Sequence, residues 1–505
     1  MKICLINPVF PSSLWDFSGC RDLSGYEFPF PPLSLMTLAG LTPNGHGVRI
    51  LDENTASLDF DIDAALVGIT GYHIQKERAF AIADEFRERG VYAVIGGSLV
   101  SESTLEECLQ HADAVFLGEA ERTWPIFLAE FSAGRPKKIY KEDTLVSMSL
   151  SPLPRFELVS LEKYSTAMVE TSRGCPYGCE FCEIPSRLGK LPRAKPIEAV
   201  MEEVKKLHCL GVDSIFFIDD NFIGSRERTI RLLKELIAFV KSVDYKMYFT
   251  CQFTLNNAVD TELLGLFREA NFKRVFMGLE TPRSETLKRI NKRQNLSCDP
   301  VKAVHAILSH GIIVWGSFIV GFDGDTPSIF GEQLKLIEDA NIPVAMVGLL
   351  QALPGTPLYE RMKKEGRLEE TEAGGIRGAH DDLTRTNIAP IGMTKEELVI
   401  GYERLIESIY EETGFGRRLI AAIRRDDGYA IKSRARLNKK NVLSLLRILR
   451  YYLLTIDIAR SRMFLRVMAE VIFRRPGAAF TALTHLAVYK HFKAFYRKGR
   501  GRPLK

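Results

Sequence analysis

At 505 residues the chain is long enough for about three domains, taking one domain per ~150 residues. With 46% hydrophobic and 26% charged residues, it is not an intrinsically disordered scaffold, and no uncharged apolar run is long enough to predict a transmembrane helix. The net charge of +5 hides an asymmetry, because residues 415–505 hold 23 Lys and Arg against 4 Asp and Glu.

Nine cysteines favour a reducing compartment over a disulfide framework, since three of them fall within one short loop. The first residues, Met1–Asn7, predict a strand and not a signal peptide. Together these features predict a cytoplasmic protein.

Residues 1–140 alternate short apolar runs with helical patterns, which predicts an open parallel α/β sheet of the flavodoxin or Rossmann type. Ligands of such sheets bind at the carboxyl ends of the strands, and glycines there admit a large ligand. The alternative is that the glycines only end the strands. The predicted strands are 2–7, 48–52, 65–70, 92–95 and 114–117, and the predicted helices are 33–41, 76–89 and 102–111. The candidate ligand contacts are Asn7, Gly71, Tyr72, Gly96, Gly97, Gly118 and Glu119.

Two segments of this region, 28–33 (Phe-Pro-Phe-Pro-Pro-Leu) and 118–121 (Gly-Glu-Ala-Glu), resemble the cobalamin-binding domain that precedes many radical S-adenosylmethionine (SAM) domains. One feature departs from many cobalamin proteins. The loop after the first strand, 7–11, lacks an Asp-x-His-x-x-Gly motif that would supply a histidine to cobalt. The resemblance therefore implies cobalamin bound without a protein histidine, the alternative being that cobalamin binding has been lost.

A linker is predicted at 141–165, and residues 166–375 then repeat a strand and a helix six times. This pattern predicts a partial (β/α)6 barrel, whose reactive groups gather at the carboxyl ends of its strands. The predicted strands are 168–170, 214–219, 248–253, 274–277, 314–320 and 345–350, and the predicted helices are 197–210, 226–243, 261–270, 300–310 and 329–340.

Three cysteines, Cys175, Cys179 and Cys182, stand at three- and two-residue gaps in a glycine-containing loop at the start of this barrel. Thiolates are the usual ligands of iron–sulfur clusters, and three of them leave one iron of a cubane open for a substrate or cofactor. A zinc knuckle would need a fourth ligand nearby, and the next histidine or cysteine lies too far along the chain.

The pattern Cys-x3-Cys-x-aromatic-Cys, completed by Phe181, resembles the signature of the radical SAM superfamily. The resemblance implies a [4Fe-4S] cluster whose open iron chelates SAM, and cleavage of SAM to a 5′-deoxyadenosyl radical. Carboxylates, amides and glycines at the barrel strand ends suit SAM binding, the alternative being polar groups that merely cap strands. The candidate SAM contacts are Phe181, Asp219, Asp220, Asn221, Thr250, Gln252, Gly278, Glu280 and Gly321.

Further segments, among them 219–224, 278–282, 318–323 and 353–359, resemble the cobalamin-dependent branch that includes the hopanoid C-2 methylases and their uncharacterised relatives. This resemblance implies methylation of an unactivated carbon in an apolar or lipid substrate, with methylcobalamin as the methyl donor and a one-electron donor such as flavodoxin or ferredoxin. The alternatives are a radical SAM enzyme of another type, such as a cyclase or methylthiotransferase, and a non-enzymatic iron–sulfur or cobalamin sensor.

Residues 376–505 predict a mostly helical region with a basic tail, with helices at 395–411, 442–454 and 458–473. Basic amphipathic helices of this kind bind anionic membrane surfaces, which predicts peripheral contact with the inner face of the membrane. A solvated extension or a dimer face is the alternative, and without a nucleic-acid fold no nucleic acid is expected. The arginines among the apolar residues are Arg447, Arg450, Arg460, Arg462 and Arg466.

Overall fold

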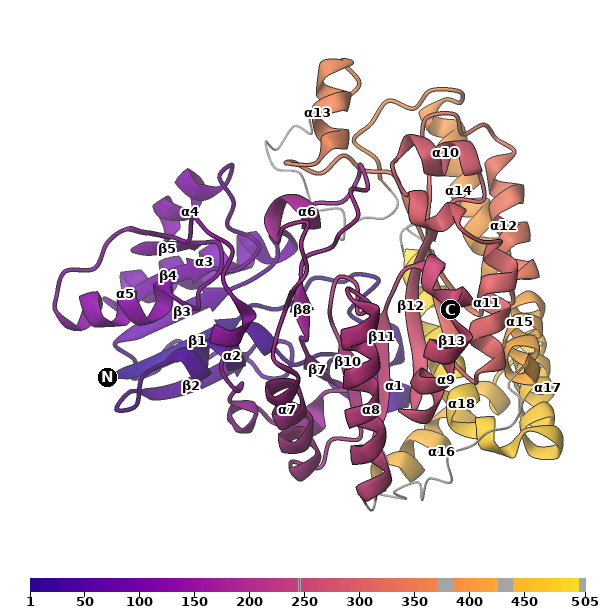
Figure 1. The fold of residues 1–505 in the computed structure, drawn as a ribbon, viewed down its shortest axis with the longest axis horizontal. Coiled ribbons are helices and arrows are strands. Elements are labelled where there is room, and N and C mark those ends of the chain that lie inside the picture. The colour runs from indigo at the N-terminus through magenta and orange to yellow at the C-terminus, as the bar shows by residue number, and fades with distance from the viewer. Residues whose placement is uncertain (244, 246, 370–384, 426–438, 499–505) are drawn as a thin grey trace.

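The computed structural model describes residues 1–243, 245, 247–369, 385–425 and 439–498. Figure 1 shows a parallel sheet on the left, a second parallel sheet wrapped by helices in the centre, and the C-terminal helices on the right. The predicted α/β fold class with a helical C-terminal region is therefore confirmed. In the described part of the chain, no helix is both long and apolar enough to span a membrane.

The N-terminal sheet has six parallel strands in the order β2-β1-β3-β4-β5-β6. The first five follow the flavodoxin-like order, whose ligand crevice opens between β1 and β3. The sixth strand and helix α5 were not predicted; β6 has three residues, of which only Tyr140 is buried, so its sequence carries no apolar alternation. The elements are β1 (Lys2–Asn7), α2 (Leu33–Leu41), β2 (Gly47–Asp52), β3 (Leu66–Thr70), α3 (Lys76–Glu88), β4 (Tyr92–Gly96), α4 (Leu105–His111), β5 (Ala114–Leu117), α5 (Thr123–Ser132) and β6 (Ile139–Lys141).

The second sheet has the order β14-β13-β12-β11-β10-β7, and every adjacent pair is parallel. Its two end strands do not pair with each other, so the predicted partial barrel of six strands is confirmed. The strands are β7 (Ala167–Val169), β10 (Ser214–Phe217), β11 (Tyr248–Gln252), β12 (Phe272–Glu280), β13 (Ile313–Val320) and β14 (Val344–Leu349).

Amphipathic helices cover the barrel, each with one buried apolar face, as the sequence predicts. A short two-stranded ribbon of β8 and β9 and the small helix α6 follow β7, and α6 lies between the two large sheets in Figure 1. These elements are β8 (Ser172–Arg173), α6 (Ile184–Arg187), β9 (Arg193–Ala194), α7 (Ile197–Cys209), α8 (Arg226–Ser242), α9 (Thr261–Glu269), α10 (Ser284–Arg289), α11 (Pro300–Ser309), α12 (Ile329–Asp339) and α13 (Pro357–Lys364).

The C-terminal helices cover the free edge of strand β14. The hydroxyl of Tyr410 donates to the carbonyl of Ala345 at 2.8 Å, and those of Tyr402 and Tyr496 donate to the carbonyl of Val347 at 3.1 and 3.3 Å. These bonds satisfy edge carbonyls that would otherwise invite another strand. The helices are α14 (Lys395–Ile409), α15 (Glu412–Arg425), α16 (Lys439–Leu453), α17 (Ile458–Arg474) and α18 (Ala479–Lys498); α15 and α18 were not predicted.

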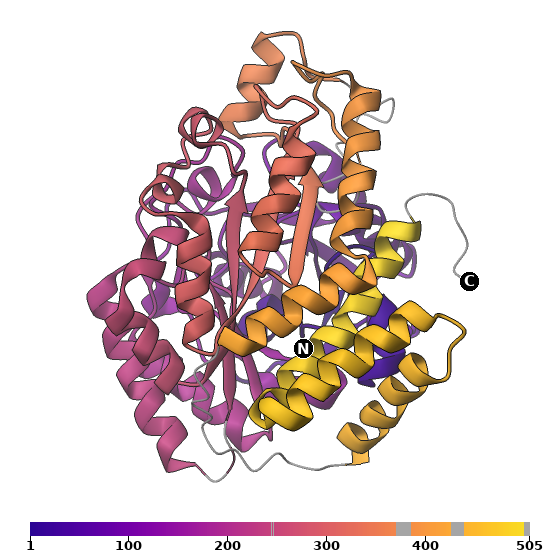
Figure 2. The same cartoon turned by 90° about the vertical axis from the view of Figure 1, so that its right-hand side faces the viewer.

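Helix α18 also holds an N-terminal segment whose role the sequence did not reveal. The ring of His491 accepts from the amide of Gly19 at 3.2 Å, and its other nitrogen lies 2.9 Å from the carbonyl of Leu14. Phe17 packs against His491 and against Trp315 of the barrel. Helix α18 therefore joins the N-terminal segment to the barrel, and Figure 2 shows it among the other C-terminal helices.

Candidate functional site

The cysteine loop, residues 171–182, includes the short strand β8 and connects β7 to α6 at the carboxyl end of the barrel. Gly174 takes a φ of +94°, and a Cβ there would lie 2.8 Å from the carbonyl oxygen of Gly189, so only glycine fits. The next residue, Cys175, donates its amide to that same carbonyl. Cys179 is buried, and Cys175 and Cys182 are partly exposed.

The far side of the loop is held by the segment after α10. The amide of Glu180 donates to the carbonyl of Ile290 at 2.9 Å, and the side chain of Asn291 donates to the carbonyl of Gly178 at 2.8 Å. Arg361 of α13 forms a two-pronged ion pair with the carboxylate of Glu180. Contacts within the protein therefore fix the loop from both sides.

Two polar side chains face the cysteine sulfurs. The side-chain amide of Gln294 lies 3.4 Å from the Sγ of Cys179. The ammonium of Lys292 pairs with the buried carboxylate of Glu280 and lies 5.6 Å from the ring centre of Phe181. Burial alone would lower the pKa of Lys292, but Glu280 and the nearby thiols of Cys179 and Cys182 raise it, so the ammonium stays charged.

These surroundings fit an iron–sulfur cluster, because donors and positive charge beside the sulfurs stabilise the anionic group. Burial raises the pKa of Cys182 to about 12 and also raises that of Cys175, so ligation of iron releases protons. Among the described residues, no three His, Cys, Asp or Glu converge as on a single metal ion. A cubane takes one thiolate per iron and so spreads its ligands further apart.

Asp219 and Asp220, which follow β10, hold the cysteine loop from inside the barrel. Oδ1 of Asp219 accepts from the hydroxyls of Ser172 at 2.6 Å and Thr171 at 2.8 Å. Oδ2 of Asp220 accepts from the amide of Gly174 at 2.9 Å. Burial raises the pKa of Asp219 to about 6, although the two hydroxyls act against it. Both carboxylates thus position the loop.

Two further candidates for SAM binding carry a buried oxygen without a hydrogen-bond partner among the described residues, namely Oδ1 of Asn221 and Oε2 of Glu280. A β-bulge between Gly278 and Glu280 turns the Glu280 backbone to a φ of +63°, and strand β12 runs through both residues, beyond its predicted end at 277. Buried acceptors of this kind fit a ligand with ammonium or hydroxyl donors, such as SAM.

The remaining SAM candidates lie on the same strands. Thr250 and Gln252 are partly exposed on β11, and the side chain of Gln252 donates to the carbonyl of Asp219. Gly321 follows β13 with a φ of +99°, and its amide donates to Asp325 at 3.0 Å. The Gly278 carbonyl accepts from Asn295. The barrel thus brings the sequence candidates to its carboxyl end, around the cysteine loop.

At the N-terminal sheet, Asn7 ends β1 and Gly71 directly follows β3, and these two strands flank the flavodoxin-like crevice. The Asn7 side chain donates to Asp52 at 2.9 Å and accepts from Gln75 at 3.4 Å. Next to Gly71, the side chain of Tyr72 is 60% exposed beside the crevice. This edge therefore offers an exposed aromatic ring and a fixed amide to a ligand.

Three more glycines lie along the same edge. A Cβ on Gly97, whose φ is +91°, would lie 2.5 Å from the Thr70 hydroxyl. One on Gly118 would lie 3.2 Å from the carbonyl oxygen of Glu142, and one on Gly96 would touch Phe116 at 3.3 Å. Gly97 is therefore required by its positive φ and by the close packing of Thr70 and Gly71 against it, which is the conformational role of a glycine that ends a strand.

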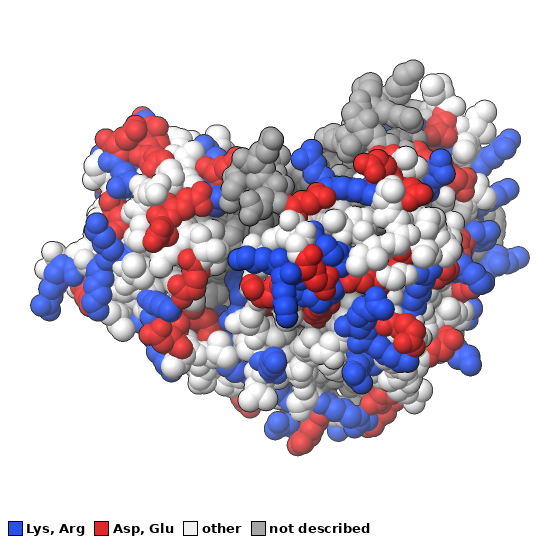
Figure 3. All heavy atoms as spheres, turned by 90° about the horizontal axis from the view of Figure 1, so that it is seen from above, with Lys and Arg blue, Asp and Glu red and all other residues white. Residues whose placement is uncertain are grey.

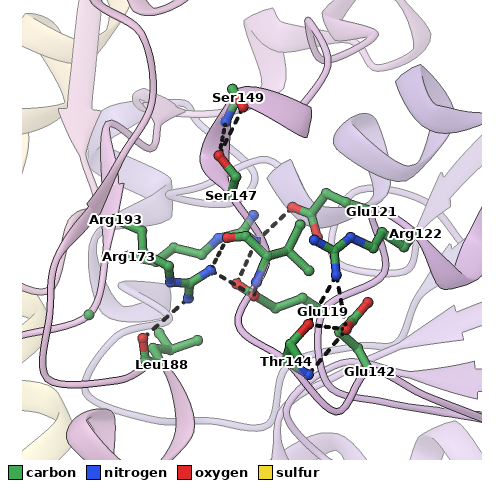
Figure 4. Close-up of polar contacts among 12 residues, drawn as sticks. Glu119, Glu121, Arg122, Glu142, Thr144, Ser147, Ser149, Arg173, Leu188 and Arg193 are labelled. Atoms are coloured by element: carbon green, nitrogen blue, oxygen red, sulfur yellow. Dashed lines mark hydrogen bonds and ion pairs between the residues drawn. The ribbon is translucent and has the colours of Figure 1, made fainter.

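Glu119, a candidate cobalamin contact, belongs to an ion cluster that joins the two sheets (Figure 4). Its carboxylate accepts from Arg173 at 2.8 Å, from Arg193 at 2.7 Å and from the amide of Val146 at 2.7 Å. Arg173 also pairs with Glu121 at 2.7 Å and Glu170 at 3.0 Å. The end of β5 is thereby fastened to β8, immediately before the first cysteine.

The charges of this ion cluster are held by their partners. Burial alone would raise the pKa of Glu119, but hydrogen bonds from Arg193 and Arg173 outweigh it and lower that pKa. Burial would lower the pKa of Arg173, and the carboxylates of Glu170 and Glu121 raise it. Figure 3, from above, shows acidic and basic side chains intermingled on this face of the molecule.

Sequence reasoning missed Gln294, Lys292 and Arg193. Gln294 and Lys292 come from a turn more than 100 residues after the cysteines, and no spacing rule connects them with the loop. Arg173 lies only two residues before Cys175, so its position was a usable signal, whereas Arg193 carried none.

Two family models match the chain. Residues 169–337 match the radical SAM superfamily, and residues 356–502 match a domain of unknown function, DUF4070. The hopanoid C-2 methylase of Rhodopseudomonas palustris is 34% identical over 77% of this chain and 73% of its own length. An uncharacterized methyltransferase of Synechocystis, sll1242, is 31% identical over 82% of this chain and 77% of its own length.

Solved structures share the fold at low identity. OxsB, a cobalamin-dependent SAM radical enzyme solved with aqua-cobalamin and SAM bound, matches 99% of this chain and 80% of its own with a TM-score of 0.60 and 16% identity. TsrM from Kitasatospora setae, a radical SAM methyltransferase solved with cobalamin and a [4Fe-4S] cluster, matches 74% of this chain and 79% of its own with a TM-score of 0.56 and 16% identity.

Proposed function

The chain belongs to the radical SAM methyltransferase family that includes the hopanoid C-2 methylase, and from this premise we propose that it methylates an unactivated carbon of an apolar substrate, with cobalamin as the methyl carrier. The hopanoid C-2 methylase is named for the lipid that it methylates, which supports an apolar or lipid substrate. The arrangement of two parallel sheets, one with the cysteine loop and one with a flavodoxin-like crevice, supports two cofactors.

A [4Fe-4S] cluster with SAM supplies a hydrogen-abstracting radical when bound, and cobalamin supplies the methyl group. The protein's task is to orient these groups and exclude water. Cys175, Cys179 and Cys182 would hold the cluster, with Gln294 and Lys292 beside their sulfurs. Asn221 and Glu280 would bind SAM through their unpartnered oxygens. The exposed ring of Tyr72 would lie against cobalamin.

The observation that carries the proposal is the ion cluster of Glu119, Arg173 and Arg193. It fastens the carboxyl edge of the N-terminal sheet to the cysteine loop, so a ligand on that edge faces the loop across a fixed distance. A substrate whose hydrogen is removed at one site and whose carbon is methylated from the other would need such a fixed geometry between the two sites. A sensor with a single cofactor has no use for it.

The proposed organisation keeps the predicted boundaries: a cobalamin-binding domain at 1–140, a linker at 141–165, the barrel at 166–375 and a helical region at 376–505. The boundary at 375 lies outside the described residues.

Radical SAM enzymes require an electron and a substrate, and flavodoxin or ferredoxin is the proposed electron donor. A cytoplasmic site of action with peripheral membrane contact completes the proposal.

The test uses anaerobically purified, cluster-reconstituted protein loaded with hydroxocobalamin. Iron, cobalt and the ultraviolet–visible spectrum are measured first, and 5′-deoxyadenosine is measured after SAM and a reductant are added. The proposal expects near-stoichiometric cobalt and deoxyadenosine formation. Cys179→Ala should abolish deoxyadenosine, whereas Cys209→Ala, at an exposed cysteine outside the loop, should not.

Deoxyadenosine without cobalt retention would keep the radical enzyme and reject the methylation mechanism, leaving a radical reaction of another type. Cobalt or iron without deoxyadenosine would favour a sensor. Incubation with SAM carrying a labelled methyl group and a lipid extract then identifies the methylated product by mass spectrometry.

A further inference from the structure

The exposed apolar side chains of this molecule are concentrated on one helical hairpin, α16 and α17 with the turn between them (Lys439–Arg474). The hairpin carries 11 of the 23 large apolar side chains that are exposed in the described part of the chain. Single exposed apolar residues are common, but so many in one short segment mark an interaction surface. Those 11 residues are Val442, Leu443, Leu445, Leu446, Leu453, Leu454, Ile456, Ile458, Leu465, Ile472 and Phe473.

The hairpin is well packed on its inner side, so the exposure does not come from a loose element. The ring of Tyr452 stacks on Phe464 with centroids 5.0 Å apart, and its hydroxyl donates to the carbonyl of Leu486 in α18 at 2.7 Å. Asp457 caps α17 by accepting from the amide of Arg460 at 3.0 Å. A rigid hairpin therefore presents its other side outward.

The most exposed apolar residues lie at the tip of the hairpin, where α16 joins α17. Ile456 is fully exposed, and Leu454 and Ile458 are 78% and 63% exposed. In Figure 2 this hairpin lies at the lower right, at the periphery of the molecule. Along α17 the outward face continues from Ile458 at helical spacing to Phe473.

The charge on the hairpin is predominantly positive. Its sequence contains eight Lys and Arg but only two acidic residues, Asp457, which caps α17, and Glu470, which is buried against Arg424. Arg450, Arg462 and Arg466 are exposed and, within the described residues, make no ion pair. Arg460, by contrast, folds back onto Thr455 and the ring of Tyr451.

From this combination we propose that the tip and outer face of the α16–α17 hairpin dock on an anionic lipid bilayer, with Leu454, Ile456 and Ile458 inserted at the headgroup boundary. Apolar side chains flanked by arginines suit that boundary, since the aliphatic groups leave water while the guanidinium groups meet lipid phosphates. A second copy docking symmetrically would bring the same arginines face to face, which is unfavourable. Nucleic acid would leave the aliphatic tip in water.

The test is flotation of the full-length, cluster-reconstituted protein with vesicles of phosphatidylcholine, with and without phosphatidylglycerol, at low and high salt. The proposal expects binding to the anionic vesicles that weakens with salt. Leu454→Asp with Ile456→Asp should reduce binding at least about tenfold. Arg450→Gln with Arg462→Gln should reduce binding by about fivefold for each charge removed, because each basic residue near an anionic surface contributes about 1 kcal/mol. Ile126→Asp, a half-exposed position on α5, should not change it.

Binding that is equal in the wild type and the Leu454, Ile456 double variant overturns the proposal, as does the absence of binding to anionic vesicles at low salt. A dimer in light scattering that the double variant abolishes also overturns it and assigns the face to self-association. Circular dichroism and deoxyadenosine formation in solution confirm that the variants fold. Because vesicle binding is measured without turnover, failure of this proposal and failure of the proposed reaction are distinguishable.

Discussion

Nη1 of Arg173 lies 2.8 Å from a carboxylate oxygen of Glu119, and this contact spans 54 residues to join the N-terminal sheet to the cysteine loop. We expect Glu119→Gln to lower the free energy of unfolding in urea by about 2 kcal/mol, because it leaves charged, largely buried partners without a matching charge. Methylated product per deoxyadenosine should fall with it, since the two sheets lose a fixed spacing.

The control is Glu102→Gln, which breaks the exposed ion pair with Lys141 and should change stability by less than about 1 kcal/mol. Cobalt content separates two roles of Glu119. Retained cobalt with reduced product indicates a positioning residue, whereas loss of cobalt indicates a direct contact with cobalamin.

Asp219 makes stability depend on pH. Its pKa is raised from 3.8 to about 6, mainly by burial, so the folded state holds this proton more tightly than the unfolded state. Its contribution to stability is therefore full below about pH 4 and is lost as the pH rises through about 6. Asp219→Asn removes this titration. In urea unfolding, the variant should gain roughly 3 kcal/mol relative to the wild type between about pH 4 and pH 7. A difference that is constant with pH would contradict this.

We expect Gln294 to raise the reduction potential of the cluster. Its amide lies 3.4 Å from the Sγ of Cys179, and hydrogen bonds to cluster sulfurs raise the reduction potential. Gln294→Leu should make the midpoint potential more negative by roughly 30 mV, about threefold in a one-electron equilibrium. An electron paramagnetic resonance redox titration measures the shift. The neighbouring exposed Arg293 provides the control Arg293→Gln, and equal potentials in both variants would refute the role of Gln294.

Arg418 anchors α15 to the barrel and is fully buried. It donates to Glu338 at 2.5 Å and to the carbonyl of Ile342 at 2.9 Å. Arg418→Met should cost about 3 to 5 kcal/mol, because it leaves buried acceptors without donors. Arg417 pairs with the same Glu338 from an exposed position, so Arg417→Met should cost less than about 1 kcal/mol. Urea unfolding of the two variants compares them directly, and similar losses would rule out burial as the cause.

The sequence predicted two kinds of element well: helices with one buried face, whose apolar residues recur at helical spacing, and strands that are buried along almost their whole length. The barrel strands β13 and β14 and the helices α7 and α8 follow that rule, and their predicted bounds lie within a few residues of the observed ones. Helix α18 was not predicted, because it is buried on several sides and includes His485 and His491, which interrupt the apolar pattern.

The residues of the candidate site also fall into two groups, those that the sequence identified and those whose roles it did not reveal. The cysteines are contiguous, so their spacing alone identified the loop. The roles of Asp219 and Glu119 were not visible, because their partners Ser172 and Arg173 meet them only after the strands have packed. A polar residue at the end of a predicted strand can therefore be placed at the carboxyl edge of its sheet. Its role cannot be predicted, because that role depends on partners that only the folded structure brings near.

The tyrosines that cap strand β14 have a consequence for synthesis of the chain. Tyr496 comes about 150 residues after Val347, so a ribosome must translate all the intervening helices before this edge can be covered. During that interval the nascent barrel presents bare backbone groups to neighbouring chains, which is the geometry of edge-to-edge aggregation. Yield of this protein in a host cell should therefore depend on translation speed and on chaperones that shield the edge.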